Sequence, residues 1–163
     1  LRSASKNVDP NVRLAMNDFV NLENTAHRPG GQYGKVIESI EKDGVCPFCH
    51  ENLPIYHKNP ILKEGKFWLL TNNMYPYEGA KYHALIIHKK HIEKFEEIVP
   101  EAWTEIKTLT EEFFKEKNIP AGSFAMRLGN TSHTGASVSH LHANVVSPDG
   151  EDKNRKPILA RIG

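Results

Sequence analysis

The chain has 163 residues, and its 21 Lys and Arg against 20 Asp and Glu give a formal net charge of +1 at pH 7. This balance excludes a dedicated nucleic-acid-binding protein, and no apolar stretch reaches the roughly 20 residues that span a bilayer. A chain of this length is expected to build one core and to fold as a single compact domain. Two cysteines do not make a disulfide framework, so we expect a cytoplasmic location.

Two helices are predicted before the first cysteine. The first covers residues 10–24, with an apolar stripe that includes Phe19 and Val20, and the second covers residues 33–42 and ends before Gly44. We therefore expect residues 1–43 to be an N-terminal helical extension and residues 44–163 to be the main domain.

The main domain is predicted to be α+β. Period-two or apolar runs predict strands at residues 67–71, 82–88, 122–128, 141–146 and 157–162. A loop through Pro54 and Pro60 precedes them, and the strongest helical pattern begins at Pro100 with apolar residues every three or four positions. One long helix among several strands, without βαβ alternation, favours an antiparallel sheet of about five strands with a long crossover helix.

The only two cysteines form the motif Cys46-Pro47-Phe48-Cys49. Such a Cys-x-x-Cys knuckle directs two thiolates at one point and is a common half of a tetrahedral zinc site. A redox dithiol is the alternative. With His50 the motif also spells a haem-attachment pattern, but that modification requires export and the N-terminus has no apolar segment for it.

Polar and apolar residues alternate along residues 137–146. A strand there places His140, His142 and Asn144 on one face, while Leu141, Ala143 and Val145 point into a core. The alternative is a strand with incidental surface histidines. A metal site at the knuckle would give one of these imidazoles a function.

Three segments together resemble the histidine-triad (HIT) superfamily. They are the knuckle, the segment Asn73-Met74-Tyr75-Pro76-Tyr77 with its continuation His83 to Ile92, and the segment Gly135-Ala136-Ser137-Val138-Ser139-His140-Leu141-His142-Ala143-Asn144-Val145-Val146. They cover residues 44–148 in the family's order. The segment from Asn73 is similar to the diadenosine polyphosphate phosphorylase-like branch, and the knuckle is similar to the zinc-bearing members.

The resemblance implies a structural zinc ion, a HIT-like sheet and a homodimer. Its implied ligands are Cys46, Cys49, His91 and His140, a closed set that leaves no open position for an activated water. Three histidines compete as ligands by their closeness in sequence. They are His50, His57 and His88, of which His88 is the first substitute because it lies three residues from His91.

The resemblance also implies the chemistry. The middle histidine of the family attacks the α-phosphorus of a nucleotide, which assigns that role to His142 and gives a covalent nucleotidyl-histidine. The expected substrate is a small nucleotide, either a dinucleoside polyphosphate or a nucleoside phosphoramidate. Ser137 and Asn144 complete the implied catalytic set. The implied nucleotide contacts are Asn73, Asn130, Gly135, Ala136 and Val138.

The chain departs from the family at its third triad position. Asn144 stands where most members have histidine and the uridylyltransferases have glutamine, so a zinc-stabilised nucleotide-binding protein with weak or no turnover is the alternative function. No tryptophan or arginine-rich run follows Val146, and residues 80–82 are expected to lengthen the loop over the base pocket. Tyr75 and Tyr77 could contact the base or pack the loop, and His83 is expected to support the sheet.

Overall fold

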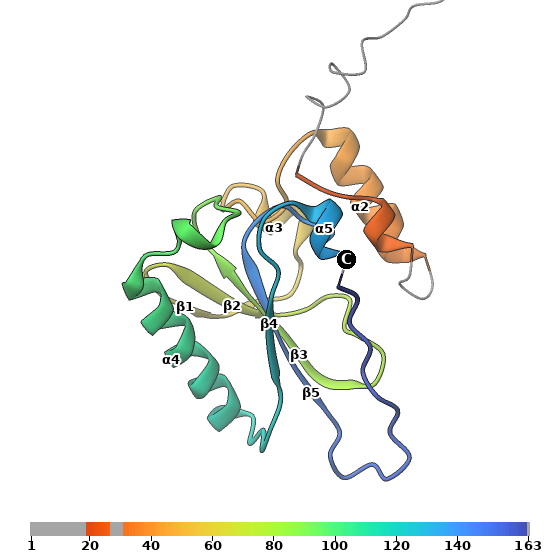
Figure 1. The fold of residues 1–163 in the computed structure, drawn as a ribbon, viewed down its shortest axis with the longest axis vertical. Coiled ribbons are helices and arrows are strands. Elements are labelled where there is room, and N and C mark those ends of the chain that lie inside the picture. Colours follow the sequence, from red (N-terminus) through yellow and green to blue (C-terminus); the bar gives the residue numbers. More distant parts are fainter. Residues whose placement is uncertain (1–18, 27–30, 163) are drawn as a thin grey trace, which may run out of the picture.

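The computed structural model describes residues 19–26 and 31–162, which form one antiparallel sheet with flanking helices (Figure 1). The strand order is β1-β2-β3-β5-β4. The strands are β1 (Ile61–Glu64), β2 (Trp68–Asn72), β3 (Ala80–His88), β4 (Ser123–Met126) and β5 (His142–Pro148). The helices are η1 (Glu23–Thr25), α2 (Gln32–Asp43), α3 (Leu53–Tyr56), η2 (Phe95–Glu97), α4 (Pro100–Glu116) and α5 (Thr131–Thr134). The α+β class and the five-stranded antiparallel sheet are confirmed.

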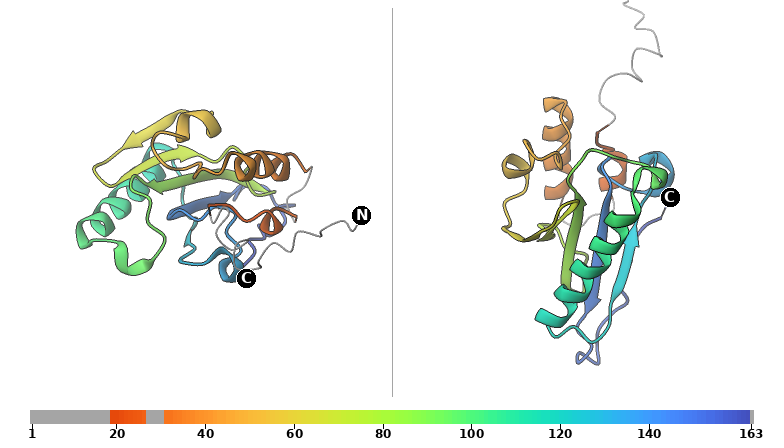
Figure 2. Two further views of the ribbon diagram at one scale, coloured as in Figure 1. Left: turned by 90° about the horizontal axis from the view of Figure 1, so that it is seen from above. Right: turned by 90° about the vertical axis from the view of Figure 1, so that its left-hand side faces the viewer.

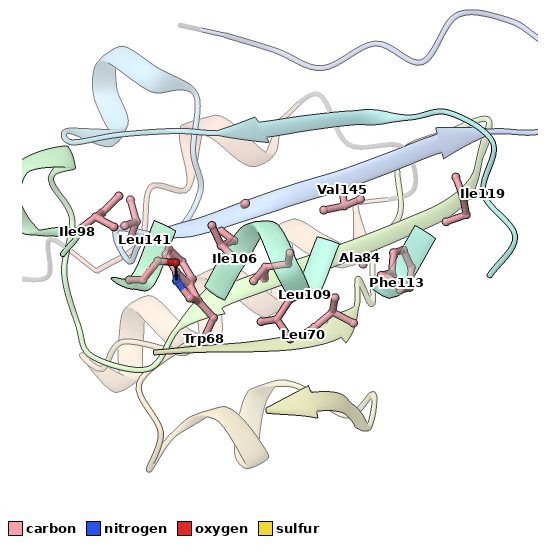
Figure 3. Packing of buried hydrophobic residues seen from close by; sticks show 13 residues of the cluster. Trp68, Leu70, Ala84, Ile98, Ile106, Leu109, Phe113, Ile119, Leu141 and Val145 are labelled. Atoms are coloured by element: carbon pink, nitrogen blue, oxygen red, sulfur yellow. Dashed lines mark hydrogen bonds between the residues drawn. The ribbon is translucent and has the colours of Figure 1, made fainter. Parts of the chain in front are cut away.

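Helix α4 covers one face of the sheet and builds the main core. It buries an apolar stripe with the 3–4 spacing seen in the sequence, comprising Ala102, Ile106, Leu109 and Phe113. These side chains share one buried cluster with alternate residues of the central strands, which are Trp68, Leu70, Ala84, Ile86, Ala143 and Val145. Figure 3 shows Ile106, Leu109 and Phe113 beside Trp68, Leu70, Ala84 and Val145. The prediction that Ala143 and Val145 point into a core is confirmed.

The opposite face of the sheet carries the polar residues of β5. His142 pairs directly with Ile87 of β3, and Asn144 pairs with Leu85. Directly paired residues of antiparallel strands share a face, so these two polar side chains lie beside a smaller apolar cluster of Leu69, Leu85 and Ile87. In Figure 2, α2 and α3 lie on this side, away from α4.

The N-terminal extension differs in part from its prediction. Helix α2 is confirmed, and it ends at Gly44, whose φ of 69° suits a glycine C-cap. Residues 10–18 of the first predicted helix lie outside the described residues. Residues 19–24 are not α-helical, because Val20 forms an antiparallel bridge with Val138 and a 3₁₀ turn follows it. Val20 and Val138 share a buried cluster with Ile37 and Ile40 of α2, which docks the extension on the segment before β5.

Three further segments depart from the sequence predictions. β1 and α3 form where a loop through Pro54 and Pro60 was expected. Residues 80–82 begin β3 and pair with the end of β5, so they do not lengthen a loop. Residues 157–162 form no strand; Figure 1 shows this end of the chain turning back beside the sheet towards α5.

Among the described residues, no helix is both long enough and apolar enough to cross a membrane.

Candidate functional site

The four residues that the family resemblance implied as metal ligands come together. Nδ1 of His140 lies 3.3 Å from Sγ of Cys46 and 3.9 Å from Sγ of Cys49, and Nδ1 of His91 lies 3.5 Å from Sγ of Cys49. All four donor atoms lie within 4.8 Å of one another. Tetrahedral zinc with sulfur and imidazole ligands requires donor separations of about 3.3–3.8 Å. The cluster is therefore compatible with a zinc site.

The far nitrogen of each histidine ring is held by a hydrogen-bond acceptor. Nε2 of His140 lies 2.6 Å from the carbonyl oxygen of His88, and Nε2 of His91 lies 3.2 Å from Oε1 of Glu93. Nε2–H of each ring donates to these acceptors and Nδ1 faces the sulfurs without a proton, which is the tautomer a metal ligand needs. The ring of His88 is not in the cluster; only its carbonyl group contributes.

The other two competing histidines also lie outside the cluster. Nε2 of His57 lies 2.8 Å from Oγ1 of Thr71, and His50 is exposed. The ligand set implied by the resemblance therefore needs no substitute.

Burial sets the protonation of this cluster. It raises the pKa of the Cys46 thiol to about 12, raises the pKa of Cys49, and lowers the pKa of His140 to about 3. Without a metal both cysteines are neutral thiols, so zinc binding would release two protons and couple the metal to folding. Four protein ligands leave no open position, and the ion would join the knuckle to the start of β5.

His142 has one ring nitrogen engaged and one available. Its Nδ1 lies 2.7 Å from the carbonyl oxygen of His140, so Nδ1–H donates to that oxygen and Nε2 keeps its lone pair. Burial lowers the pKa of His142 to about 4, which leaves the ring neutral at pH 7. The ring packs edge-on against Phe48 and lines a cavity of about 860 Å³.

The residues before His140 form a loop that lines the same cavity. The N–H of Gly135 donates to the carbonyl oxygen of Thr131, and the N–H of Ser139 donates to that of Phe19. Within the described residues, the N–H groups of Ser137 and Val138 have no such acceptor. Ser137 and Val138 both line the cavity, so this loop offers donors to an anion beside His142.

Asn24 is a loop-positioning residue that the sequence analysis missed. Its Nδ2 donates to the carbonyl oxygens of Thr131 at 2.9 Å and Ala136 at 2.7 Å, which holds the loop against the N-terminal extension. In the sequence it falls within a predicted helix, and nothing there indicates a contact more than a hundred residues away.

Asn144 is oriented by His83. The N–H of Tyr77 donates to Nδ1 of His83, so the proton of that ring is on Nε2, which lies 2.9 Å from Oδ1 of Asn144 and 3.1 Å from Nδ2 of Asn73. Nδ2 of Asn144 is then directed away from His83 and is buried without a partner in the described part of the chain. His83 thus does more than support the sheet.

The predicted nucleotide contacts divide into two groups. Asn73 lines the cavity and lies beside the His83 ring, with Oδ1 accepting from the N–H of Tyr75 at 2.8 Å. Asn130 lines no cavity near His142: it is exposed and caps α5, because its Oδ1 accepts from N and Oγ of Ser132 at 2.8 and 2.7 Å. Asn130 is therefore not one of the residues that line the site.

Arg127 is a second residue that the sequence analysis missed. It follows β4 directly, and continuing the β4–β5 register places it opposite His142. Its Nη1 and Nη2 lie 3.3 Å from Oη of Tyr77, and Nη2 donates to the carbonyl oxygen of Arg161 at 2.7 Å. Its Nε is buried and has no partner among the described residues. The sequence placed Arg127 within the predicted strand 122–128, and it did not indicate that this strand pairs with the strand that carries His142.

A second cavity of about 810 Å³ adjoins the first over β4 and β5. The C-terminal residues 153–162 form much of its outer wall, although the sequence analysis found no basic run there. Six residues line both cavities: Tyr77, Arg127, Asn144, Arg155, Lys156 and Pro157. The two cavities therefore meet at Asn144 and Arg127.

The sheet order, the long helix on one face, and His142 at the start of β5 with His140 two residues before it are typical of a histidine-triad protein. The family model described as "Scavenger mRNA decapping enzyme C-term binding" matches residues 46–157. The chain belongs to this family, within the histidine-triad superfamily.

The chain is similar to several solved structures, and the fold agrees with the first of those described below. A HIT family hydrolase from Clostridium thermocellum is 22% identical, with a TM-score of 0.51, and the match covers 65% of this chain and 91% of that one. A structure named "Hit Like Protein" is 27% identical over 59% of this chain and 94% of its own, with a TM-score of 0.48. A Zn-bound histidine triad family protein from Mycobacterium smegmatis is 19% identical over 67% and 82%, with a TM-score of 0.48. No protein with a curated description matches the chain.

Proposed function

We propose that the protein is a nucleotide hydrolase or nucleotidyltransferase that acts at the α-phosphate through a nucleotidyl-histidine intermediate on His142. The observation that carries this proposal is the hydrogen bond of 2.7 Å from Nδ1–H of His142 to the carbonyl oxygen of His140. It fixes the tautomer and leaves Nε2 as a neutral nucleophile facing the cavity.

In the first step, the Nε2 lone pair of His142 forms a bond to the α-phosphorus. The bond from phosphorus to the leaving group breaks, and its electron pair departs with that group. We assign the N–H groups of Ser137 and Val138, together with the Ser137 hydroxyl, as donors to the reacting phosphate, because both residues line the cavity. They stabilise its charge without rearrangement, since the loop is already held by Asn24.

In the second step, water or another acceptor attacks the phosphorus from the cavity. The P–N bond breaks and its electron pair returns to Nε2, while a proton of the attacking water passes to solvent. Nδ1–H remains on the His140 carbonyl group throughout, so the ring holds one orientation in both steps.

The test is a screen of dinucleoside polyphosphates and nucleoside phosphoramidates, with and without inorganic phosphate, read by product identity. The proposal expects a nucleoside monophosphate from water, or a nucleoside diphosphate when phosphate is the acceptor, and at least a 1,000-fold loss in His142→Ala, on the order of losses for covalent nucleophiles. Unchanged turnover in His142→Ala would contradict it.

Asn144 favours a second candidate, a zinc-stabilised nucleotide-binding protein with weak or no turnover. An amide donates a hydrogen bond but carries no positive charge to a phosphate. Tight nucleotide binding without product or adduct would support this candidate.

We also propose a homodimer. β4 is an edge strand of the sheet, and Phe124 on it is 43% exposed. A monomer by light scattering would contradict this.

A further inference from the structure

The loop of residues 130–139 carries the proposed phosphate donors, and a single segment holds it in place. Among the described residues, every hydrogen bond that leaves this loop ends on the segment 19–24. The other hydrogen bonds of the loop join its own residues, such as that from the N–H of Gly135 to the carbonyl oxygen of Thr131. The position of the loop therefore depends on the N-terminal extension.

Residues 19–21 pair with residues 137–139 as a short antiparallel strand, centred on the pair Val20–Val138. Two backbone hydrogen bonds flank this pair, with lengths of 2.8 and 3.0 Å. Backbone N–H and C=O groups alternate in direction along a strand, so Val138 directs its own N–H to the edge away from residues 19–21. That N–H has no backbone acceptor among the described residues, and Val138 lines the same cavity as His142. The pairing thus leaves this donor available to a ligand.

Asn24 joins the two ends of the turn that precedes this strand. Its Nδ2 donates to the carbonyl oxygens of Thr131 at 2.9 Å and Ala136 at 2.7 Å, which uses both hydrogens of the amide. One side chain therefore fixes the span from residue 131 to residue 136. Asn24 also lines the cavity of His142, so this contact lies at the wall of the site.

The segment is itself anchored on α2. The Val20 side chain is 6% exposed and shares a buried cluster with Ile37 and Ile40. A Cβ at Gly34 would lie 3.2 Å from Oγ1 of Thr25, so the helix packs closely against the 3₁₀ turn of the segment. Helix α2 thus supports the segment, and the segment supports the loop.

We propose that the segment 19–24 completes the phosphate site, and that Asn24 is a positioning residue for the chemical step. The segment precedes residues 46–157, so it lies outside the part of the chain that the family model matches. It acts through the loop, by holding the donors of Ser137 and Val138 at fixed positions while charge develops on the phosphate. This inference rests on the function proposed above.

Loss of this support should lower kcat more than it changes KM. A loop that is free between residues 131 and 136 can still reach the substrate, but its donors no longer occupy one position when the transition state forms. Interactions that strengthen in the transition state raise kcat, whereas those made equally with the bound substrate affect KM. A displacement of about 1 Å at a reacting group can cost about 100-fold in rate.

The test compares Asn24→Ala with wild type, using di(adenosine) tetraphosphate and di(guanosine) tetraphosphate in parallel because the base is open. We expect kcat to fall about 10- to 100-fold and KM to change less than about 3-fold, with the fold intact by circular dichroism. Asn24→Gln keeps the amide donor and should restore part of kcat. An unchanged kcat, or a loss confined to KM, would overturn the inference.

Asn59→Ala is the matched control. Nδ2 of Asn59 also donates to a backbone carbonyl oxygen, that of Asn72 at 3.0 Å, but Asn59 lines neither cavity and does not contact the loop. This variant should leave kcat and KM unchanged. If Asn24→Ala is unfolded by circular dichroism, Asn24→Ser replaces it, and the same selective loss of kcat is expected because a hydroxyl has only one hydrogen to donate.

A different readout applies if wild type turns over neither substrate, which would mean that the proposed function has failed. Amide hydrogen exchange, measured by NMR, then tests the support of the loop directly. Exchange of the Gly135 and Ser139 amides at least about 10-fold faster in Asn24→Ala than in Asn59→Ala supports the segment as the element that positions the loop. Equal exchange in the two variants overturns it.

Discussion

Nε2 of His83 lies 2.9 Å from Oδ1 of Asn144, and this contact determines which end of the Asn144 amide faces the cavities. An asparagine alone could present either its oxygen or its nitrogen. Because the N–H of Tyr77 occupies Nδ1 of His83, the ring must donate from Nε2, and Asn144 must accept with its oxygen. The replacement of the family's third histidine thus leaves an oriented donor in the site.

The first prediction concerns this contact. His83→Phe should lower kcat/KM about 10-fold or more, since the amide is then free to turn its oxygen towards the phosphate. His83→Gln, which offers an N–H at a similar reach, should restore part of the loss. In an Asn144→Ala background, His83→Phe should have little further effect, because the two act through one contact. Additive losses in the double variant would show that His83 acts independently of Asn144.

The second prediction concerns zinc. The purified protein should contain one zinc ion per chain, and Cys46→Ser should lose it. His50→Asn is the matched control, because His50 adjoins Cys49 but is exposed and outside the cluster. A chelator should lower the melting temperature of wild type by about 10 °C or more, as expected when a closed metal site that is coupled to folding is emptied. A metal-free wild type that melts at the same temperature with and without chelator would contradict a structural role.

The third prediction concerns the pH dependence of turnover. Burial lowers the pKa of His142 to about 4, so the neutral nucleophile persists in acid. With a dinucleoside tetraphosphate, kcat/KM should change less than about 2-fold between pH 7.5 and 5, whereas an ordinary pKa of 6.5 would give a loss of about 30-fold at pH 5. An acid limb centred near pH 6.5, with the fold intact by circular dichroism, would contradict this.

The same burial predicts how stability depends on pH. The native state binds fewer protons than the unfolded state wherever a histidine pKa is lowered, as it is for His142 and also for His57, His88 and His140. The contribution of His142 to the free energy of unfolding is therefore fully present above pH 6.5. It falls from there towards pH 4, by about 1.4 kcal/mol per pH unit. Urea unfolding at pH 7.5 and 5.5 measures the combined slope; equal stability at both would contradict it.

The fourth prediction concerns the turn between β1 and β2. Oε1 of Glu105 accepts from the N–H groups of Phe67 and Trp68, and Oε2 accepts from that of Lys66. Glu105→Ala should lower the free energy of unfolding by about 2–4 kcal/mol, because three hydrogen bonds to a charged group are lost. Glu111→Ala, which removes only an exposed ion pair on the same helix, should cost less than about 0.5 kcal/mol. If the two variants lost equal unfolding free energy in urea, Glu105 would contribute no more to stability than an exposed residue.

Glu105 also illustrates what the sequence could not predict. Its position on the polar side of α4 indicates a solvated residue, and only the approach of Gly65 to the helix reveals its partners. A Cβ at Gly65 would clash with the Glu105 carboxylate, so the missing side chain is what allows the contact. Long-range pairings of this kind, like that of Asn24 with the loop before His140, leave no local pattern in the sequence.

The cysteine knuckle and the alternation around His142 were predictable for a different reason, because both patterns are local in the sequence. The choice of His91 and His140 as metal ligands, and the role proposed for His142, depended on the family resemblance. No local sequence pattern predicts where Arg127 and the C-terminal wall of the second cavity lie. Residues 153–162 carry scattered cations whose common position depends on where the chain turns back beside the sheet.

The central claim is a covalent intermediate on His142, and intact-mass spectrometry of a reaction quenched in alkali tests it most directly. Alkali is chosen because a phosphoramidate survives it better than acid. With a dinucleoside polyphosphate we expect a mass increase of one nucleoside monophosphate group, located on the peptide that contains His142 and absent from His142→Ala. Turnover without such an adduct under rapid quench, or an adduct that persists in His142→Ala, would contradict the account.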